Sequence, residues 1–424
     1  MNRGTVIHVP RRFVAHEWGG TETVILEISK QQLAAGYEPK IVTSMALATS
    51  RHDVIGGIAV ERYPHIYPFC GLSAEDRAAM DKKGGNLLSL PLLAALLREP
   101  DVRIYHAHAL KRLGGSVRTA ARLRRKPYVV SLHGGVFDVP AGELDDLTKP
   151  IQGKFEWGKP FGALLGARRV LDDADHVICV GESESVKARA QLGHDRVSYL
   201  PNGVDCLRFA KGDNESFRKR FEIPEDAFLL INIGRIYSQK NQLGLLQAFS
   251  RFRSQVPGAR LLLIGPITQP DYEAKLRDFI AAEKLGDAVT IIPGLGNDSG
   301  ALVDAYHAAD VFVLASRHEP FGIVVLEAWC AAKPVIASRV GGLQSLVRDS
   351  ETGLFFEPDA EDAADQLAAC FARLHADPGL RRHLGEAGKK EAFEHYDWSR
   401  INDRLENIYQ LAEAHAGGSK EGGK

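Results

Sequence analysis

Short apolar segments with helical stretches between them recur along most of this chain, and this alternation restricts the fold more than any other sequence feature. Examples in the first half are residues 5–9, 128–132 and 176–180, and examples in the second half are residues 228–233 and 311–315. Strands that are apolar throughout and alternate with helices form parallel sheets whose two faces are both covered. We therefore predict an α/β protein built on parallel sheets.

Length, charge and cysteine content narrow the class of protein. A chain of 424 residues, 45% of them hydrophobic, is long enough for two or three domains with substantial cores. A formal net charge of −1 argues against a dedicated nucleic-acid-binding protein. The five cysteines are scattered and form no C-x-x-C pair, so neither a zinc site nor a disulfide framework is indicated, and a reducing compartment is expected. Because no apolar run reaches the length of a membrane span and no signal peptide precedes the first strand, we expect a cytoplasmic protein.

The residues that follow the apolar segment 311–315 combine negative charge with the start of a helix. A turn at Gly322 leads into a buried helix, which we predict over residues 323–332. Backbone N–H groups at such a helix start lack intrahelical partners, and with the helix dipole they favour an anion such as phosphate. The carboxylates of Glu319 and Glu327 only accept hydrogen bonds, so beside a phosphate they suit the hydroxyl groups of ribose and sugar. The alternative is an ordinary strand–turn–helix with two surface glutamates.

Two cations follow another predicted strand. The apolar residues 228–233 end in Gly234 and Arg235, and Lys240 lies just beyond them. A departing diphosphate develops negative charge that must be stabilised in the transition state. Arg235 offers a planar guanidinium for bidentate contacts, and Lys240 offers a mobile ammonium. Either residue alone is an ordinary basic surface residue, but together at the mouth of one strand they suit a diphosphate leaving group.

Three histidines lie near predicted strand ends in the first half. His106 and His108 are two residues apart and share one face of a strand. A metal site is a weak interpretation without a third ligand, so we interpret the pair as packing or cleft-lining residues. His133 follows the strand 128–132, at the carboxyl edge of the sheet, where open α/β folds bind ligands. The alternative for His133 is a hydrogen-bonded loop histidine.

Glu319 and Glu327 are separated by seven residues, and Phe321 and Gly322 lie between them. This arrangement closely resembles the donor-site signature of retaining glycosyltransferases of the GT-B class, family 4 in particular. Other landmarks of that family follow in the same order over nearly the whole chain: Gly19-Gly20, His133, Pro201-Asn202-Gly203, and Arg235 with Lys240.

The resemblance implies a GT-B architecture, in which two Rossmann-like domains face each other across a cleft. Residues 1–205 would form the acceptor domain, and residues 206–397 would form the donor domain that binds the nucleotide sugar. A helix over about residues 398–414 would pack back onto the first domain. The remaining residues, 415–424, are small and charged and are expected to form a disordered tail.

The resemblance also assigns roles to individual residues. Glu327 would bind the ribose, and Glu319 with the backbone of the following residues would hold the donor sugar and its phosphates. Catalytic roles would belong to His133, which would face the donor sugar, and to Glu319, Arg235 and Lys240. The full set of expected donor-binding residues is Gly19, Gly20, Gly234, Arg235, Lys240, Pro293, Glu319, Phe321, Gly322, Ile323, Val324 and Glu327. The acceptor would be lined by His16, Trp18 and His108.

The implied reaction is transfer of a hexose from a nucleotide diphosphate sugar to a hydroxyl acceptor, with retention at the anomeric carbon and without a metal or cofactor. A UDP-sugar is favoured as donor and GDP-mannose is a second possibility; the acceptor would be a saccharide, a lipid-linked compound or a small molecule. Alternatives on the same fold are a nucleotide-sugar epimerase, a phosphorylase and a non-catalytic binding protein for sugar nucleotides.

A basic stretch over residues 111–126 stands apart from the donor motifs. It contains seven cations and lies within a longer segment that has no acidic residue. A solvated basic helix is the favoured interpretation, and a patch for anionic lipid or an anionic acceptor is the alternative, which would place the protein peripherally at the inner membrane face. The acidic run Asp172-Asp173-Ala174-Asp175 resembles a metal motif only superficially, and we interpret it as charge at a helix end.

Overall fold

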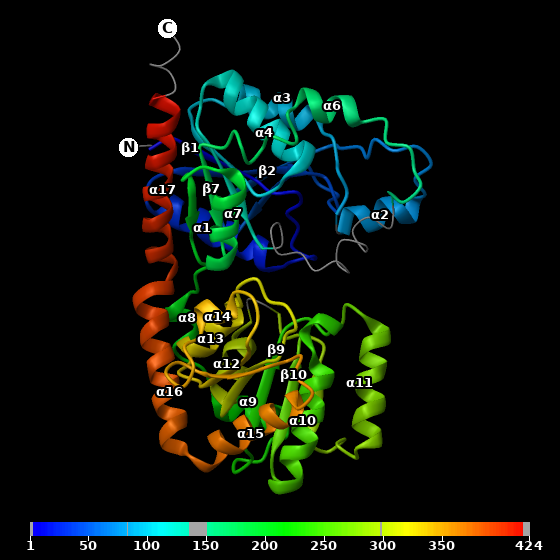
Figure 1. Ribbon diagram of the computed structural model, residues 1–424, viewed down its shortest axis with the longest axis vertical. Helices are drawn as coiled ribbons and strands as arrows, with labels where there is room; N and C mark the ends of the chain where they lie inside the picture. Colours follow the sequence, from blue (N-terminus) through cyan, green and yellow to red (C-terminus); the bar gives the residue numbers. More distant parts are fainter. Residues whose placement is uncertain (1–2, 83, 135–150, 297–298, 419–424) are drawn as a thin grey trace. The chain divides into compact units, whose positions relative to one another are not determined.

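The chain divides into two compact units, each of which is a parallel-sheet α/β domain as predicted. The computed structural model describes residues 3–82, 84–134, 151–296 and 299–418. Unit 1 comprises Met1–Pro201 and Ile401–Lys424, and unit 2 comprises Asn202–Arg400 (Figure 1). The chain thus leaves unit 1 after Pro201, within the Pro201-Asn202-Gly203 segment, and returns to it in the last helix.

Unit 1 is built on an eight-stranded sheet with the order β3-β4-β2-β1-β5-β6-β7-β8. All neighbours pair in parallel except β3, which runs antiparallel to β4 at the edge. The edge strand was not predicted, because its side chains are mostly exposed and give no apolar run. The eight strands are β1 (Thr5–Val9), β2 (Glu38–Ser44), β3 (His52–Ile55), β4 (Ile58–Tyr63), β5 (Val102–Ala107), β6 (Tyr128–Leu132), β7 (His176–Cys179) and β8 (Val197–Tyr199).

The helices of unit 1 connect these strands. Those in the described residues before Pro201 are α1 (Gly20–Ala34), α2 (Ala74–Lys82), α3 (Leu90–Arg98), α4 (Lys111–Arg124), α6 (Lys159–Leu164) and α7 (Glu182–Leu192). Helix α6 ends at Leu164, and turns follow it. Gly166 has a φ of +63°, and a Cβ there would meet the guanidinium of Arg118 at 2.5 Å, so the chain turns sharply at this glycine.

Unit 2 is built on a six-stranded sheet with the order β11-β10-β9-β12-β13-β14, and all of its strands are parallel. Successive residues of β9 face opposite sides, so that Leu229 and Ile231 belong to one hydrophobic core and Leu230 to another. This two-sided burial explains why the strands are apolar throughout. They are β9 (Leu229–Ile233), β10 (Arg260–Ile264), β11 (Val289–Ile292), β12 (Val311–Leu314), β13 (Val335–Ser338) and β14 (Leu354–Phe356).

Helices cover both faces of the second sheet (Figure 1). They are α8 (Cys206–Phe209), α9 (Asn214–Arg220), the 3-10 turn η2 (Ser238–Lys240), α10 (Gln242–Gln255), α11 (Pro270–Ala282), α12 (Gly300–Ala308), α13 (Ile323–Cys330), α14 (Leu343–Leu346), α15 (Ala363–Ala376), α16 (Pro378–Glu391) and the π-helical turn η3 (Ala392–Tyr396).

The last helix, α17 (Trp398–Gly418), starts in unit 2 and belongs to unit 1 from Ile401 onward. The guanidinium of Arg103, on β5, donates to the carboxylates of Glu406 and Glu413 at 2.7 Å each. Because α17 extends to Gly418, the prediction of a disordered tail over residues 415–424 is wrong for residues 415–418, which are helical. The ring of His415 makes a 2.9 Å hydrogen bond with Asp175 and holds this last turn in place. Residues 419–424 lie outside the described residues.

Three of the seven cations in the basic stretch 111–126 pair with carboxylates of their own domain. Arg112 is buried and pairs with Glu156. Arg118 and Arg122 both pair with Asp173. Our interpretation of the acidic run 172–175 as charge at a helix end is wrong, because turns and not a helix precede it. Residues 135–150 lie outside the described residues. Among the helices that the structure describes, none is both long enough and apolar enough to cross a membrane.

Candidate functional site

The connections of unit 2 create a switch point between β9 and β12. From β9 the chain moves to one side through β10 and β11, and it then returns to the other side of β9 as β12. In open parallel sheets, ligands bind outside the carboxyl ends of the strands at such a point. The loop after β9 carries Gly234, Arg235 and Lys240, and the loop after β12 carries Glu319, so both predicted loops start from this switch point.

Lys240 and Glu319 form an ion pair across these two loops. Nζ of Lys240 lies 2.5 Å from Oε2 of Glu319, and both side chains are largely buried. The hydroxyl of Ser316 donates to the same carboxylate oxygen at 3.3 Å. The backbone reinforces the contact, since the N–H of Arg317 donates to the carbonyl of Gln239 at 2.8 Å. The sequence placed both charged residues at the site but did not predict that they pair.

The backbone of Glu319 is fixed by a glycine pair that follows β13. The N–H of Gly342 donates to the carbonyl of Glu319 at 2.9 Å. A Cβ on Gly341 would lie 2.4 Å from that carbonyl oxygen, and a Cβ on Gly342 would lie 2.1 Å from the carbonyl oxygen of Pro320. Only glycine allows this approach of two backbones, so the loop after β13 holds the one after β12.

The helix α13 starts at this place as the sequence predicted, although it ends at Cys330 rather than at residue 332. Its cap, Gly322, has a φ of +96°, and a Cβ there would meet the side chain of Leu343 at 2.6 Å. Phe321 is buried, whereas Ile323 and Val324 are half-buried at the first turn. The N–H groups of a first turn have no intrahelical acceptor, so this helix start can receive an anion.

Glu327 is the second carboxylate of the motif and lies one turn further along α13. The hydroxyl of Tyr306, on α12, donates to its Oε2 at 2.6 Å. Burial raises the pKa of Glu327, and the hydrogen bond from Tyr306 and the charge of Arg208 oppose this rise. A carboxylate that one neighbour holds rigidly still has a second oxygen with which it can accept hydrogen bonds from ribose hydroxyls.

The remaining donor residues of unit 2 lie along the same sheet edge. The N–H of Gly234 donates to the carbonyl of Ile264 at 2.9 Å, so its loop is tied to the end of β10. Arg235 is exposed, and its guanidinium lies 5.5 Å from the centre of the Tyr237 ring. Pro293 is exposed at the end of β11, two strands away from β9.

Unit 1 has a switch point of its own, between β1 and β5. The loop after β1 leads to Gly19, which caps α1 in an extended conformation, and to Gly20, which is exposed. The end of β5 carries His106 and His108. The expected glycine loop and the expected histidine pair thus follow the two strands that flank the switch point.

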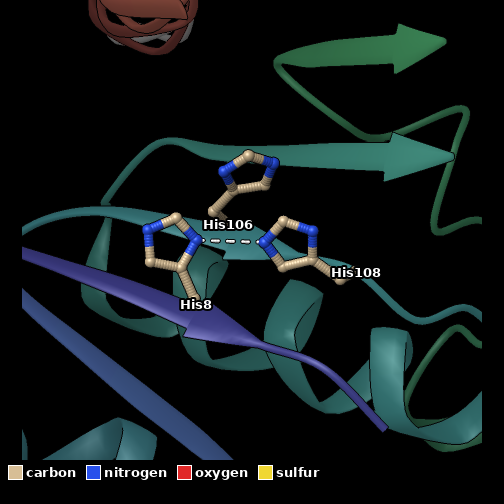
Figure 2. Close-up of side chains that lie close together, drawn as sticks. All are labelled: His8, His106 and His108. Atoms are coloured by element: carbon tan, nitrogen blue, oxygen red, sulfur yellow. Dashed lines mark hydrogen bonds between the residues drawn. The ribbon is translucent and has the colours of Figure 1, made fainter. Parts of the chain in front are cut away.

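A third imidazole joins this pair. His8 lies on β1, is fully buried, and makes a 3.0 Å hydrogen bond from its Nδ1 to Nε2 of His108 (Figure 2). One nitrogen atom from each of the three rings lies within 4.8 Å of the others, so the cluster offers three possible ligands, a number that a metal site can have. His8 was not among the predicted site residues, although a histidine inside the apolar strand Thr5–Val9 is a sequence signal for it.

The other residues expected in unit 1 differ in how they are held. Nε2 of His133 lies 2.8 Å from Nδ1 of His108, and burial lowers the pKa of His133 to about 4. Trp18 donates from Nε1 to Thr23 at 2.9 Å, and its ring packs edge-on against a buried phenylalanine, so it stabilises its own loop. His16 is exposed in a turn.

A pocket of about 220 Å³ lies beside His108 and includes Arg11 and Lys111 in its lining.

Comparison with known proteins assigns this chain to a family. Residues 213–391 match the family described as "Glycosyl transferases group 1", and residues 18–208 match "Glycosyltransferase Family 4". The D-inositol 3-phosphate glycosyltransferase of Kribbella flavida is 30% identical over 391 residues, which are 88% of this chain and 86% of that protein. The protein of the same name from Thermomonospora curvata is 30% identical over 415 residues, covering 92% of this chain and 90% of the relative.

Solved structures show the same fold. The Anabaena protein HepE, in complex with UDP and glucose, superposes with a TM-score of 0.71 at 17% identity, covering 96% of this chain and 100% of HepE. Sucrose-phosphate synthase from Thermosynechococcus elongatus superposes with a TM-score of 0.72 at 21% identity, covering 97% and 100%. From the sequence matches and this fold together, the chain belongs to the family 4 glycosyltransferases of the GT-B class.

Proposed function

We propose that this glycosyltransferase uses a nucleotide diphosphate sugar as donor, with a UDP-sugar favoured over GDP-mannose, and retains the configuration of the anomeric carbon. The observation that supports this proposal most is the pairing of Lys240 with Glu319 beside the start of α13, at the switch point of unit 2. An ammonium, a carboxylate and first-turn N–H groups in one place suit a diphosphate that is linked to a sugar. The bound UDP in HepE supports the choice of donor.

In the proposed reaction, the bond between the anomeric carbon and the β-phosphate oxygen breaks, and its electron pair leaves with the phosphate. The acceptor hydroxyl oxygen forms the new bond on the same face, and its proton passes to the departing phosphate oxygen. The products are the glycoside and the nucleoside diphosphate. Lys240, Arg235 and the amides of α13 would stabilise the charge that grows on the leaving group, so the proposal needs no metal.

Glu319 and Glu327 would hold hydroxyl groups on the two sides of the diphosphate. We propose that Glu319 contacts the donor sugar while it orients Lys240, and that Glu327, held by Tyr306, contacts the ribose. Carboxylates are the natural partners here, because each sugar hydroxyl can donate a charge-assisted hydrogen bond to them. His133 would contact the donor sugar from unit 1.

On the acceptor side, we propose the pocket beside His108. Two of the side chains that line it, Arg11 and Lys111, are cationic, so it suits a hydroxyl compound that also carries an anionic group. The names of the relatives from Kribbella flavida and Thermomonospora curvata make D-inositol 3-phosphate the first acceptor to test.

A panel of UDP-, GDP- and ADP-sugars, each with and without D-inositol 3-phosphate, tests the proposal. We expect nucleotide release that depends on acceptor, persists in EDTA, and gives a product whose anomeric coupling in proton NMR matches the donor. Interconversion of donors without acceptor would indicate an epimerase, release only with inorganic phosphate would indicate a phosphorylase, and melting shifts without turnover would indicate a binding protein. Any of these three results would overturn the proposal.

A further inference from the structure

A continuous chain of hydrogen bonds leads from α1 to His133 through two other imidazoles, those of His8 and His108. Oε1 of Gln32 lies 2.9 Å from Nε2 of His8. Nδ1 of His8 lies 3.0 Å from Nε2 of His108, and Nδ1 of His108 lies 2.8 Å from Nε2 of His133. His8 and His108 each use both ring nitrogens in this chain. His133 uses its Nε2, and its Nδ1 is the end of the chain.

A second branch starts from the same glutamine. Nε2 of Gln32 donates to the hydroxyl of Tyr409, on α17, at 3.2 Å. That hydroxyl lies 2.8 Å from Nδ1 of His106, and Nε2 of His106 lies 2.7 Å from the hydroxyl of Ser131. Gln32 therefore joins both branches, with its carbonyl oxygen in one and its amide nitrogen in the other.

The cluster of His8, His106 and His108 has the number of ligands of a metal site, but its geometry does not suit one. The rings of His106 and His108 stack, with centres 4.1 Å apart and planes 28° apart (Figure 2). A metal binds the lone pair in the plane of each imidazole, so two stacked rings do not aim at a common point. Both nitrogens of all three rings also have hydrogen-bond partners, and none of these partners is a carboxylate.

Burial keeps these imidazoles neutral. It lowers the pKa of His8 and of His133 to about 4, and it lowers the pKa of His106 and His108 well below the usual value. A neutral imidazole carries one N–H and one lone pair. In an unbroken chain of neutral imidazoles, the direction of the first hydrogen bond therefore determines the direction of all the others.

The orientation of Gln32 supplies that first direction. Its carbonyl oxygen accepts from Nε2 of His8, so Nδ1 of His8 bears the lone pair and must accept from Nε2 of His108. Nδ1 of His108 in turn must accept from Nε2 of His133. Reversing the amide of Gln32 would reverse every bond of the chain, and the orientation seen here is the one in which its Nε2 donates to the hydroxyl of Tyr409.

We propose that Gln32, held by Tyr409, selects the tautomer of His133 in which Nε2 carries the hydrogen and Nδ1 offers a lone pair to a hydroxyl of the bound substrate. The substrate half of this inference rests on the proposed glycosyl transfer. Gln32 and Tyr409 act as positioning residues, because they touch His133 only through other side chains. An imidazole that accepts a hydrogen bond orients a sugar hydroxyl differently from one that donates, so the tautomer governs how the substrate sits.

The test reads the tautomer directly, by proton–nitrogen correlation NMR of the ¹⁵N-histidine-labelled full-length protein at pH 7. We expect the Nε2–H tautomer for His133, with the resonance assigned by its loss in His133→Gln. In Gln32→Met the chain loses its direction, so His133 should show both tautomers and kcat should fall about tenfold with little change in folding. Tyr409→Phe, which frees the amide of Gln32 to rotate, should shift the tautomers in the same sense. Ser29→Ala is the matched control, because Ser29 is buried on α1 and its hydroxyl donates to the carbonyl of Ile25 in the same helix.

The outcomes separate this inference from the proposed function. An Nδ1–H tautomer in the wild type, or an unchanged His133 spectrum in both Gln32→Met and Tyr409→Phe, would overturn the inference even if turnover is normal. Stoichiometric zinc in the purified protein, with histidine shifts that change on chelation, would overturn it in favour of a metal site. The expected tautomers without turnover on any donor would overturn the proposed function and the substrate half, while the role of Gln32 in setting the tautomer would be supported.

Discussion

Nζ of Lys240 and Oε2 of Glu319 are 2.5 Å apart, so the two loops that leave the switch point of unit 2 are joined by a charge pair. A lysine ammonium has three donor hydrogens, and this contact uses one of them. The pair therefore orients the ammonium and leaves it donors for a phosphate. The same contact gives Glu319 a fixed position from which it can accept a sugar hydroxyl.

Replacing Lys240 by alanine should remove most of the transfer activity. The ammonium would act on charge that develops in the transition state, and loss of one such preorganised donor lowers kcat by roughly 10²–10³-fold. Steady-state nucleotide release measures the effect, with Lys275→Ala as the control, because Lys275 is an exposed lysine of the same unit. Normal kcat in Lys240→Ala would remove this residue from the site.

Glu327→Gln should stabilise unit 2 at neutral pH while it weakens nucleotide binding. Burial raises the pKa of Glu327 above its ordinary value of 4.5, so the folded protein holds this proton more tightly than the unfolded chain. The stability that the group contributes is complete below pH 4.5 and is lost as the pH rises through the raised pKa. The neutral amide of glutamine has no charge to bury, and its oxygen can still accept the hydrogen bond from Tyr306.

Urea unfolding at several pH values measures this difference. The midpoint of Glu327→Gln should exceed that of the wild type at pH 7, and the gap should close as the pH falls toward 4.5. Glu225→Gln is the control, because Glu225 is exposed. A variant that is less stable than the wild type at pH 7 would contradict the role of burial.

Much of this architecture could be predicted from the sequence, because fully buried parallel strands consist of continuous runs of apolar residues. The strands Thr5–Val9 and Tyr128–Leu132 match their predicted bounds. Strand β3 could not be predicted in this way, since its exposed residues lack the pattern. The start of α13 could be predicted from the sequence, because Gly322 marks a turn before an apolar run, and its φ of +96° is one that glycine adopts readily.

Contacts between residues that are far apart in the chain could not be predicted from the sequence. Gln32 and Tyr409 are 377 positions apart, and nothing in either segment indicates that they share a hydrogen bond. The charges of Lys240 and Glu319 could be placed at strand ends, but their pairing depends on which strands are neighbours. Strand order is determined by how the whole sheet assembles, so it could not be predicted from local sequence patterns.

Unit 1 should lose stability as the pH falls from 6.5 toward 4. His8 has a pKa of 6.5 in the unfolded chain and about 4 when buried against His106, His108 and the neutral Gln32. Its contribution to stability is therefore complete above pH 6.5 and is lost as the pH falls toward 4. At pH 5 this one residue accounts for about 2 kcal/mol, from about 1.4 kcal/mol per pKa unit.

The comparison variant for this pH effect is His8→Gln, which cannot take up the proton. It should be less stable than the wild type at pH 7, where it loses buried hydrogen bonds, and the difference should shrink at pH 5. Melting temperatures of the two proteins across this range provide the measurement. A wild-type stability that stays flat between pH 7 and pH 5 would mean that the buried imidazoles are not held neutral.

Arg103→Ala should loosen the C-terminal helix from unit 1. The guanidinium of Arg103 bonds to two carboxylates of α17, those of Glu406 and Glu413, and these contacts raise its pKa. Removing the cation leaves two partly buried carboxylates close together without their counter-ion. We expect a loss of about 1–3 kcal/mol in the free energy of unfolding, and faster amide hydrogen exchange in α17 beyond residue 401. Arg400→Ala is the control, because Arg400 is exposed on the same helix. Because Tyr409 lies between the two glutamates, the exchange of its amide should rise with theirs. Protection unchanged from the wild type would show that the helix is anchored without the Arg103 ion pairs.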